Sequence, residues 1–575
     1  MLLSIVTAFC LLSVGVRATP SFSNHTNFNF THKEIVKDVE EATPTYTQSL
    51  LSQLWSGMTI QTAAVRTVVD ATPLPKEELI EPPNLPSFES TKKLPKDFIW
   101  GWSATGPQIE GAVKADNRGP SVWDTISHKV EGFIQGPVNL DVAANHYYLY
   151  KQDIMRMATL GIPYYSLSIS WSRIFPFGNG TVNQAGLDFY KSLIDFMAGN
   201  NIQPIVTLYH WDIPQALQNS YGGFLSDRIV ADFGNYVRTV FNALGHRVKI
   251  WITLNEPQIF CGQYKSWPEN GVPDSVFPVH GVSNGLERKY RCGHNALLAH
   301  ANAVKIFREE IEPKFGKGKI SFANSWDFTP PLTSSREDRD ASKRSLEFNA
   351  AWFGYPVYVT GDYPVSMRQS LGNLLPQFTS EQRKMIKGST DFYAWDAYTG
   401  YPVTGPKNED GYYDYYDCVR NRDHPAWPEC SEPSMVVPGG WLVGNEAQDE
   451  WLHDTPDLFR QGVVWSWKTF KPSAYFIPEF GFSDWGESNK TIAQARIDNE
   501  RISYLQGYLN AILELVNSDK INLIGVMGWS MMDNVEWQEG VYSRFGFQYV
   551  DFWSLRRYFK KSAFYFRNFF KHYTS

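Results

Sequence analysis

The sequence predicts an α/β protein: a single (β/α)8 TIM barrel with long loops over its C-terminal face and an N-terminal extension. The main observation is that eight short apolar runs, from Phe98 to Gly528, alternate with longer stretches of mostly amphipathic helical pattern. Strand–helix alternation predicts a parallel sheet, and eight such units predict that the sheet closes into a barrel. An open doubly wound sheet is the structural alternative, but no Gly-rich nucleotide-binding loop follows the first run.

The predicted elements follow one another along the chain in strand–helix order. The strands are Phe98–Ala104, Tyr164–Ser170, Pro204–Tyr209, Ile250–Asn255, Ile320–Asn324, Phe392–Trp395, Ala474–Ile477 and Leu523–Gly528. Helical patterns fall between most of them, as in Ala185–Met197, Asp227–Leu244 and Ala493–Val516. The segment from about Pro402 to Lys471 is too long for a plain loop, so we expect it to extend over the barrel mouth.

Composition and charge exclude several classes of protein. The chain has 575 residues, of which 43% are hydrophobic and 20% charged, which is ordinary for a globular protein. Its formal net charge is −7 with acids and bases interspersed, which argues against a nucleic-acid partner. No segment after the N-terminus is long and apolar enough to span a bilayer, so we expect no membrane span in the mature chain.

The N-terminal region differs from the rest and divides the chain into three predicted parts. Residues 1–18 are predicted to be a secretory signal, because an apolar stretch precedes small residues that suit cleavage after Ala18; a signal anchor is the alternative. Residues 19–94 are rich in Ser, Thr, Asn and Pro, which indicates an extension with a helix near Tyr46–Ser56 and then a linker. Residues 95–575 form the predicted barrel, and the signal predicts a secreted, extracellular protein.

The cysteines and glycosylation triplets are consistent with export. Four cysteines outside the signal allow three disulfide connectivities. The short separation of Cys418 and Cys430 favours that bridge together with Cys261–Cys292, with free buried thiols as the alternative. Triplets for N-glycosylation stand at Asn24, Asn29, Asn179 and Asn489.

Two glutamates at the ends of apolar runs are the main candidates for chemistry. Glu256 precedes Pro257 after the fourth run, and Glu479 precedes Phe480 and Gly481 after the seventh. Sites of such barrels lie at the C-terminal strand ends, so both carboxylates are expected at one rim. Most enzymes that cleave glycosidic bonds use a facing pair of carboxyl groups as their catalytic residues. A lone glutamate more often only caps a turn, so other strand ends must support this interpretation.

Three further strand ends carry side chains that suit a sugar. Amide, imidazole and carboxylate groups there can bind hydroxyls, and indole rings offer flat apolar faces. The residues are Gln108 after the first strand, His210 and Trp211 after the third, and Trp529, Glu536 and Trp537 after the eighth. Taken singly, His210 and Trp529 are as easily explained as core residues, but their joint occurrence with the glutamates favours a sugar pocket. No metal-ligand spacing is present, so neither a metal nor a cofactor is expected.

Beyond these strand ends, the sequence resembles glycoside hydrolase family 1, the β-glucosidase family, from about Leu94 to Tyr573. The resemblance also includes Ser168–Pro176 (SISWSRIFP) and Arg544–Phe547 (RFGF). It implies that Glu256 is the general acid/base and Glu479 the nucleophile. It further implies that the sugar is held by Gln108, His210, Asn255, Trp529, Glu536 and Trp537, and that Tyr398 hydrogen-bonds the nucleophile.

Three departures from the family pattern surround the predicted nucleophile. Phe480 and Gly481 follow Glu479 where the family usually has Asn-Gly, and Ser166 stands where the family has an arginine that pairs with the nucleophile. Asp396 replaces an asparagine two residues before Tyr398. Loss of a guanidinium and gain of a carboxyl both disfavour an ionised nucleophile, so we expect a rebuilt environment with a base from elsewhere.

The sequence therefore predicts a secreted retaining β-glucosidase that acts on a small-molecule glucoside or oligosaccharide through a covalent glycosyl-enzyme. Glu536 favours an unphosphorylated, glucose-like unit. A transglucosidase of the same fold is one alternative, and an inactive sugar- or protein-binding relative, suggested by Ser166, is the other. The aglycone, the preference among glucose, galactose and fucose, and the oligomeric state remain open at this point.

Overall fold

The computed structural model describes residues 47–574 and contains a closed barrel of eight parallel strands. Around the barrel the strand order is β1-β12-β11-β6-β5-β4-β3-β2, so each strand lies beside its neighbours in the chain. The strands are β1 Ile99–Ala104, β2 Tyr164–Ser168, β3 Gln203–Thr207, β4 Ile250–Asn255, β5 Lys319–Ser325, β6 Tyr393–Asp396, β11 Tyr475–Phe480 and β12 Leu523–Trp529. All eight predicted strands and the predicted barrel are confirmed.

Alternate residues of the strands face into and out of the barrel. Ile205, Ile252 and Phe476 belong to a small cluster of buried apolar residues contributed only by barrel strands and the residues next to them. Val206 and Trp251, one position along, belong instead to the large cluster that includes the surrounding helices. This alternation fills the barrel interior and leaves the outer face to pack against helices.

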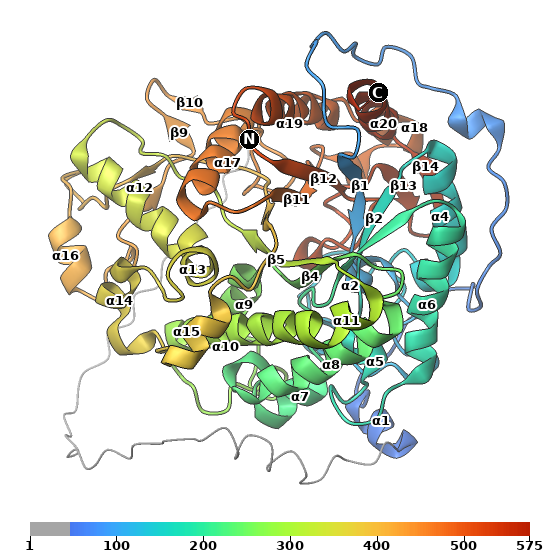
Figure 1. The fold of residues 1–575 in the computed structure, drawn as a ribbon, viewed down its shortest axis with the longest axis horizontal. Coiled ribbons are helices and arrows are strands. Elements are labelled where there is room, and N and C mark those ends of the chain that lie inside the picture. The colour runs from blue at the N-terminus through green and yellow to red at the C-terminus, as the bar shows by residue number, and fades with distance from the viewer. Residues whose placement is uncertain (1–46, 575) are drawn as a thin grey trace, which may run out of the picture. The chain divides into compact units, whose positions relative to one another are not determined.

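Helices follow the strands and cover the outside of the barrel (Figure 1). The long ones are α4 His146–Leu160, α6 Gln184–Gly199, α8 Arg228–Leu244, α9 Pro257–Glu269, α10 Gly285–Ile306, α12 Arg336–Phe348, α17 Pro456–Phe470, α19 Asn499–Asn517 and α20 Lys561–Tyr573. Shorter helices are α1 Gln48–Leu54, α2 Gly106–Ile109, α3 Val122–Lys129, α5 Trp171–Ile174, α7 Gln215–Tyr221, α11 Glu312–Phe315, α13 Ala350–Gly354, α14 Val365–Leu371, α15 Ser380–Ile386, α16 Tyr415–Arg420 and α18 Ile492–Ala495. Within residues 47–574, none of the helices combines the length and apolar character that a membrane crossing requires.

Three small antiparallel strand pairs lie outside the barrel sheet. They are β7 Val403–Thr404 with β8 Glu432–Pro433, β9 Val436–Val437 with β10 Trp441–Leu442, and β13 Gln548–Asp551 with β14 Arg556–Phe559. The first two pairs lie in the long segment after β6.

Two sequence-based boundaries were wrong. The predicted helix Ala493–Val516 is broken into α18 and α19, because the Asp498 carboxylate between them accepts hydrogen bonds from Arg501 Nη1 (2.6 Å) and Ser562 N (2.9 Å). The predicted mouth segment Pro402–Lys471 also ends earlier than expected. Its last residues form α17, whose buried apolar face packs against α19 as the outer helix between β6 and β11.

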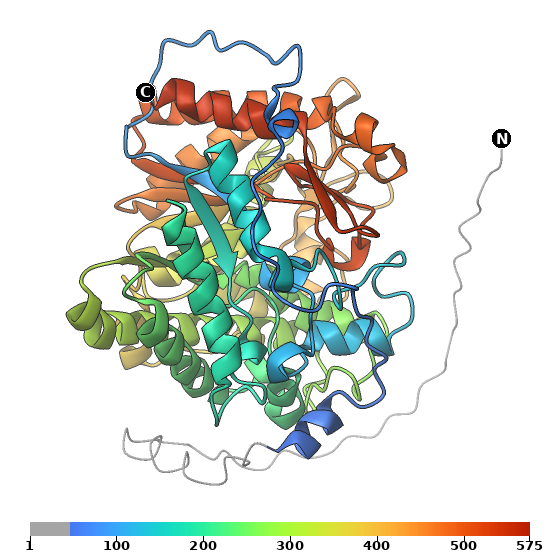
Figure 2. The ribbon, with the colours of Figure 1, turned by 90° about the vertical axis from the view of Figure 1, so that its right-hand side faces the viewer.

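The described part of the N-terminal extension, residues 47–94, runs along the outside of the barrel (Figure 2). Its helix α1 lies within the predicted range, and Trp55, which is 4% exposed, donates from Nε1 to the Arg118 carbonyl at 3.0 Å. Further along, Val69 N donates to the Tyr148 carbonyl at 2.9 Å. The ring of Phe88 contacts four rings of α20. This segment therefore packs onto the barrel by specific contacts. The predicted signal and the triplets at Asn24 and Asn29 lie outside the described residues.

Two disulfides are formed by the four cysteines outside the predicted signal. Cys261 in α9 is bonded to Cys292 in α10, which ties together two helices of the unit that follows β4. Cys418 in α16 is bonded to Cys430 and closes a short loop in the segment after β6.

The two glycosylation triplets within the described residues differ in exposure. Asn489 is exposed, whereas Asn179 is half-buried and donates to Asp232 Oδ1 at 3.1 Å.

Candidate active site

The structure brings the predicted site residues together at the C-terminal ends of the barrel strands. Each follows a strand or lies in its last two residues, so the parallel sheet brings them to one rim. They are Gln108 (after β1), His210 and Trp211 (after β3), Asn255 and Glu256 (β4), Tyr398 (after β6), Glu479 (β11), and Trp529, Glu536 and Trp537 (β12 and the loop after it). Hydrogen bonds and ring contacts link every one of them except Glu256, whose carboxyl lies close to that of Glu479.

The two glutamates are positioned by different local structures. Glu256 lies between β4 and α9 with φ 46°, and Pro257 occupies the first position of the helix. A positive φ is uncommon outside glycine, and it turns the chain sharply from the strand into the helix. Glu479 instead lies inside β11, one residue before the strand ends, because the strand extends beyond its predicted limit. Both residues are 7% exposed.

The carboxyl groups of Glu256 and Glu479 face each other closely. One oxygen of each, together with one oxygen of Asp396, forms a group whose members all lie within 4.8 Å of one another. Inverting glycosidases need about 6.5–9.5 Å between their carboxyl groups to admit a water, whereas retaining enzymes use about 5–5.5 Å. This separation lies below the range of inverting enzymes and close to that of retaining ones, so it favours direct attack by one carboxylate on a sugar.

Glu479 accepts two hydrogen bonds that favour its ionised form. Asn255 Nδ2 donates to Oε1 at 3.3 Å, and the Tyr398 hydroxyl donates to Oε2 at 2.9 Å. Asn255 Nδ2 also lies 3.4 Å from His210 Nε2. These contacts join residues from β3, β4, β11 and the loop after β6 into one chain of polar groups around the carboxylate. The charge of a carboxylate with two donors is stabilised relative to the protonated form.

A second polar group lies between the loops after β1 and β12. Gln108 is fully buried, and its Nε2 donates to Glu536 Oε2 at 3.3 Å and to the Val535 carbonyl at 3.1 Å. Thr105 Oγ1 donates to Gln108 Oε1 at 2.7 Å, which fixes the orientation of the amide. Burial, with a further contribution from Asp449, raises the pKa of the Glu536 carboxyl. Amide and carboxyl groups held in this way are suited to binding sugar hydroxyls.

Aromatic rings line the same rim. Trp211 and Trp537 are stacked with ring centroids 4.5 Å apart, and Trp537 also contacts His210 at 5.9 Å. Trp529, which is 3% exposed, is nearly parallel to His210 at 6.3 Å. Burial lowers the pKa of His210 to about 3, so its imidazole is neutral at physiological pH and can offer one donor and one acceptor.

The carboxyl groups at the centre of the site are strongly perturbed. Burial raises the pKa of Glu256 to about 7, and the negative charge of Asp327 adds to this effect while a hydrogen bond with Ser325 opposes it. Burial and then the charge of Glu256 raise the pKa of Glu479. Burial, followed by the charges of Glu479 and Glu256, raises the pKa of Asp396. Three carboxyl groups this close cannot all be ionised, so the group retains protons at neutral pH.

A buried ion pair connects the segment after β1 with the segment after β2 at the rim. Arg173, which is 1% exposed, donates from Nε to Glu110 Oε2 at 2.6 Å and from Nη2 to the Gly111 carbonyl at 2.7 Å. The hydroxyl of Tyr190 donates to the other oxygen of Glu110 at 2.7 Å. A buried ion pair whose remaining atoms are also hydrogen-bonded fixes local geometry, because loss of one partner leaves an unpaired charge.

The surroundings of Glu479 differ from the sequence-based expectation in one respect. Ser166 is buried in β2 and brings no charge. Throughout residues 47–574, no lysine or arginine nitrogen lies within 4.0 Å of the Glu479 or Asp396 carboxylate. The expected replacement base is therefore not found at ion-pair distance, and Asp396 is the new charged group beside the nucleophile candidate.

Three residues of the site were missed by the sequence analysis. Ser325, the last residue of β5, and Asp327 lie beside Glu256 and influence its pKa. Trp451 is 49% exposed and packs edge-on against Tyr398, with centroids 5.6 Å apart and an interplanar angle of 80°. Ser325 and Asp327 could have been found from the sequence, since they are polar residues that follow the apolar run of the fifth strand. Trp451 could not have been found in this way, because it lies in the irregular segment after β6.

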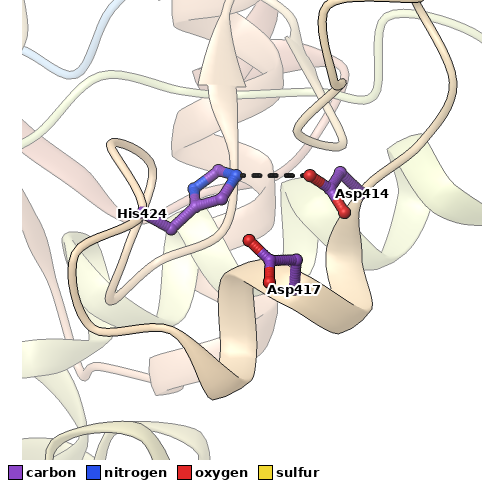
Figure 3. Close-up of side chains that lie close together, drawn as sticks. All are labelled: Asp414, Asp417 and His424. Atoms are coloured by element: carbon purple, nitrogen blue, oxygen red, sulfur yellow. Dashed lines mark ion pairs between the residues drawn. The ribbon is translucent and has the colours of Figure 1, made fainter.

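A separate group of two aspartates and a histidine lies near the second disulfide in the chain. Asp414 Oδ2 lies 3.9 Å from His424 Nε2, and Asp417 lies beside them (Figure 3). The backbone N–H of Ala426 donates to His424 Nδ1 at 3.0 Å. A neutral imidazole whose Nδ1 accepts a hydrogen bond carries its proton on Nε2, which then points to Asp414. His424 is thus held through Nδ1 by the backbone of its own loop, and Nε2 faces Asp414 at ion-pair distance.

A parallel eight-stranded barrel with two close, buried carboxyl groups and sugar-suited side chains at its C-terminal rim has the site of a glycoside hydrolase. Comparison with known proteins agrees. The model of glycosyl hydrolase family 1 matches residues 90–574, and the chain belongs to this family. The family resemblance inferred from the sequence is thereby confirmed.

Relatives of similar length are named as glucosidases. The chain is 37% identical over 499 residues to raucaffricine-O-β-D-glucosidase of Rauvolfia serpentina, covering 82% of this chain and 90% of the relative. It is 36% identical over 478 residues to β-glucosidase 1B of Phanerodontia chrysosporium, covering 82% and 84%. These two proteins come from different organisms yet share the name of the same activity.

Solved structures show the same fold. A family 1 β-glucosidase of the fungus Humicola insolens in complex with glucose has a TM-score of 0.77 and 36% identity, covering 84% of this chain and 99% of that one. A rice β-glucosidase mutant in a covalent complex with glucose has a TM-score of 0.75 and 34% identity, covering 82% and 98%.

Proposed function

We propose that this protein is a retaining β-glucosidase, with Glu479 as the nucleophile and Glu256 as the general acid/base. The observation that carries the proposal is the separation of at most 4.8 Å between their carboxyl groups. Double displacement requires such a distance, because the nucleophile must reach the anomeric carbon while the acid reaches the leaving oxygen. The glucosidases among the relatives, including one with covalently bound glucose, support the same reaction.

In the first step, the ionised Glu479 attacks the anomeric carbon and the carbon–oxygen bond to the leaving group breaks. Glu256 gives its proton to the leaving oxygen, and a pKa of about 7 keeps it protonated until then. The product is a glycosyl ester on Glu479. In the second step Glu256, now ionised, takes a proton from water, and the water oxygen attacks the same carbon and releases Glu479 as a carboxylate.

The surrounding residues supply the sugar contacts in this proposal. Gln108 and Glu536 bind hydroxyls on one side, His210 and Asn255 bind on the other, and Trp529 packs on the sugar face. Asn255 also touches Glu479, so it can bind the hydroxyl next to the anomeric carbon, where contacts strengthen in the transition state. A neutral, glucose-like sugar suits this set, because none of these residues carries a positive charge that would bind a phosphate.

The test uses an aryl β-glucoside with a very good leaving group, such as 2,4-dinitrophenolate. The wild type should hydrolyse it, and nuclear magnetic resonance should detect the β-anomer of glucose first. Such a leaving group needs no protonation, so Glu256→Gln should release about one equivalent of phenolate in a burst and then stall. Glu479→Gln should show no burst. The exposed Glu409→Gln is the matched control and should behave as the wild type. Initial release of the α-anomer, or a burst from Glu479→Gln, would refute the assignment.

We further propose that the chain is exported and processed, with 1–18 as signal, 19–94 as extension and 95–575 as catalytic domain. The two disulfides support this proposal, because such bonds persist mainly in oxidising compartments. Mass spectrometry of the protein recovered from the culture medium should find an N-terminus after Ala18 and glycan on Asn489. Recovery only inside cells, with residue 1 intact, would exclude it.

A further inference from the structure

The least explained group in the site is the carboxyl of Asp396. This residue ends β6, is 1% exposed, and neither of its oxygens accepts a hydrogen bond from any residue of the described chain. A buried ionised carboxylate without donors is strongly unfavourable, since nothing replaces the water it has lost. The geometry alone therefore indicates that this carboxyl carries a proton.

Two candidate acceptors for this proton lie close to Asp396. One Asp396 oxygen lies within 4.8 Å of oxygens of both Glu479 and Glu256. The backbone connects the first pair directly, because Ala397 N donates to the Glu479 carbonyl at 2.9 Å and β6 pairs with β11 in the barrel. Glu479 already accepts bonds from two donors, whereas Asp396 accepts none, so the negative charge of the pair belongs on Glu479 and the proton on Asp396.

We propose that Asp396 is a positioning residue: a neutral carboxylic acid that donates a hydrogen bond to Glu479 and holds the nucleophile in its ionised form without a neighbouring base. The proposal rests on the proposed function, in which Glu479 attacks the sugar. It accounts together for two features of residues 47–574, the absence of a base at ion-pair distance and the carboxyl without donors. A carboxylic acid kept neutral in an apolar site is a known form of hydrogen-bond donor in catalysis.

The proton stays on Asp396 through both chemical steps. In the first step the hydrogen bond passes from the Glu479 carboxylate to the ester oxygen that this carboxylate becomes. In the second step it assists departure of Glu479, because negative charge returns to the oxygens that accept the bond. Glu256 alone exchanges a proton with the leaving group and with water, so the proton balance of the proposed reaction is unchanged.

The charged and titratable groups facing Asp396 determine how pH acts on it. The burial and nearby negative charges that raise its pKa are consistent with a proton retained at neutral pH. Two carboxyl groups that share one proton lose it only at high pH, because the second ionisation creates two adjacent charges. The facing groups are Glu479, Glu256 and Tyr398, and none of them is a lysine, an arginine or a histidine.

Kinetics of two variants separate this role from simple packing. Asp396→Ala removes the donor and should lower kcat by about 10–100-fold with little change in KM, the usual effect of losing a hydrogen bond to a charged group. Asp396→Asn restores a neutral donor of the same shape and should recover most of this loss. If alanine and asparagine were equally damaging, or equally harmless, the proposal would be wrong.

The alkaline limb of kcat/KM gives an independent readout. A neutral Asp396 and an asparagine place the same charge beside Glu256, so Asp396→Asn should move this limb by less than about 0.3 pH units. An ionised Asp396 within 4.8 Å would instead raise the pKa of Glu256. Its removal would then move the limb down by about 2–3 units at an effective dielectric constant of about 20. A shift of that size overturns the proposal.

Infrared spectroscopy tests the protonation state without any turnover. The difference spectrum between Glu256→Gln and the double variant Glu256→Gln/Asp396→Asn at neutral pH should contain the C=O stretch of one protonated carboxyl group. A carboxylate band in its place would refute the proposal even if the enzyme hydrolyses glucosides. Conversely, an inactive protein that shows the band would refute only the proposed function. If Na⁺, Mg²⁺ or Ca²⁺ raised the Tm of the wild type but not of Asp396→Asn, the group would be a cation site and the proposal would fail.

Discussion

Replacing Glu256 by glutamine should stabilise the protein while it impairs the proposed reaction. The pKa of Glu256 is raised from 4.5 to about 7. A difference of about 2.5 units corresponds to about 3 kcal/mol at 1.36 kcal/mol per unit. Below about pH 4.5 the carboxyl is protonated in both the folded and the unfolded state and has no such effect. Between pH 4.5 and about pH 7 the unfolded state releases the proton and the folded state retains it, so the free energy of unfolding falls as pH rises. Glutamine cannot ionise, so the variant avoids this loss.

The assay is chemical unfolding of wild type and Glu256→Gln at pH 4 and pH 8. The two free energies of unfolding should agree at pH 4, and at pH 8 the variant should be more stable by about 3 kcal/mol, with 2 kcal/mol a reasonable lower bound. Glu409→Gln is the matched control, because this glutamate is exposed and should give equal stabilities at both pH values. A pH-independent difference for Glu256→Gln would show that its carboxyl is not perturbed by burial, and the reasoning on the acid/base would be refuted.

Three further predictions concern the same structure. Asp327→Asn should move the alkaline limb of kcat/KM to lower pH, because it removes a negative charge that raises the pKa of Glu256. Ser325→Ala should move this limb to higher pH, because it removes a hydrogen bond that lowers the same pKa. Shifts of the two variants in the same direction would contradict this account. Tyr398→Phe removes the 2.9 Å hydrogen bond to the nucleophile and should lower kcat about 10–100-fold; an unchanged kcat in a fluorogenic glucoside assay would exclude that role. Replacing Cys261 and Cys292 by serine opens a loop of separation 31 and should cost about 3–4 kcal/mol by loop entropy; denaturant midpoints equal to those of the wild type would disprove it.

The barrel could be predicted from the sequence because its signals are local. A strand buried in a parallel sheet, such as Ile250–Asn255, is a continuous apolar run, and it can be recognised without knowing which strands lie beside it. Boundaries set by side-chain contacts could not be predicted. The break before α19 depends on the Asp498 contacts with Arg501 and Ser562, and Ser562 is 64 residues further along the chain. The packing of residues 47–94 on the barrel likewise depends on distant partners such as Tyr148 and Tyr573.

The candidate site divides in the same way. Side chains at strand ends, such as Glu256 and Gln108, could be found because a parallel barrel brings all its strand ends to one rim. The protonation state of Asp396 could not be predicted, since the sequence does not show which donors from β4, β5 and β11 reach its carboxyl group. The sequence indicated that the nucleophile had lost its usual partner, but only the structure shows that Asp396 lies beside it without donors.

The most direct test of the central claim is to trap the covalent intermediate. A 2-deoxy-2-fluoro-β-glucoside with a good leaving group slows the second step, so the sugar should remain attached to the protein. Digestion and mass spectrometry should then find the label on Glu479 in the wild type and no label in Glu479→Gln. A label on the adjacent Asp396, or no covalent adduct in a protein that still hydrolyses glucosides, would contradict this account.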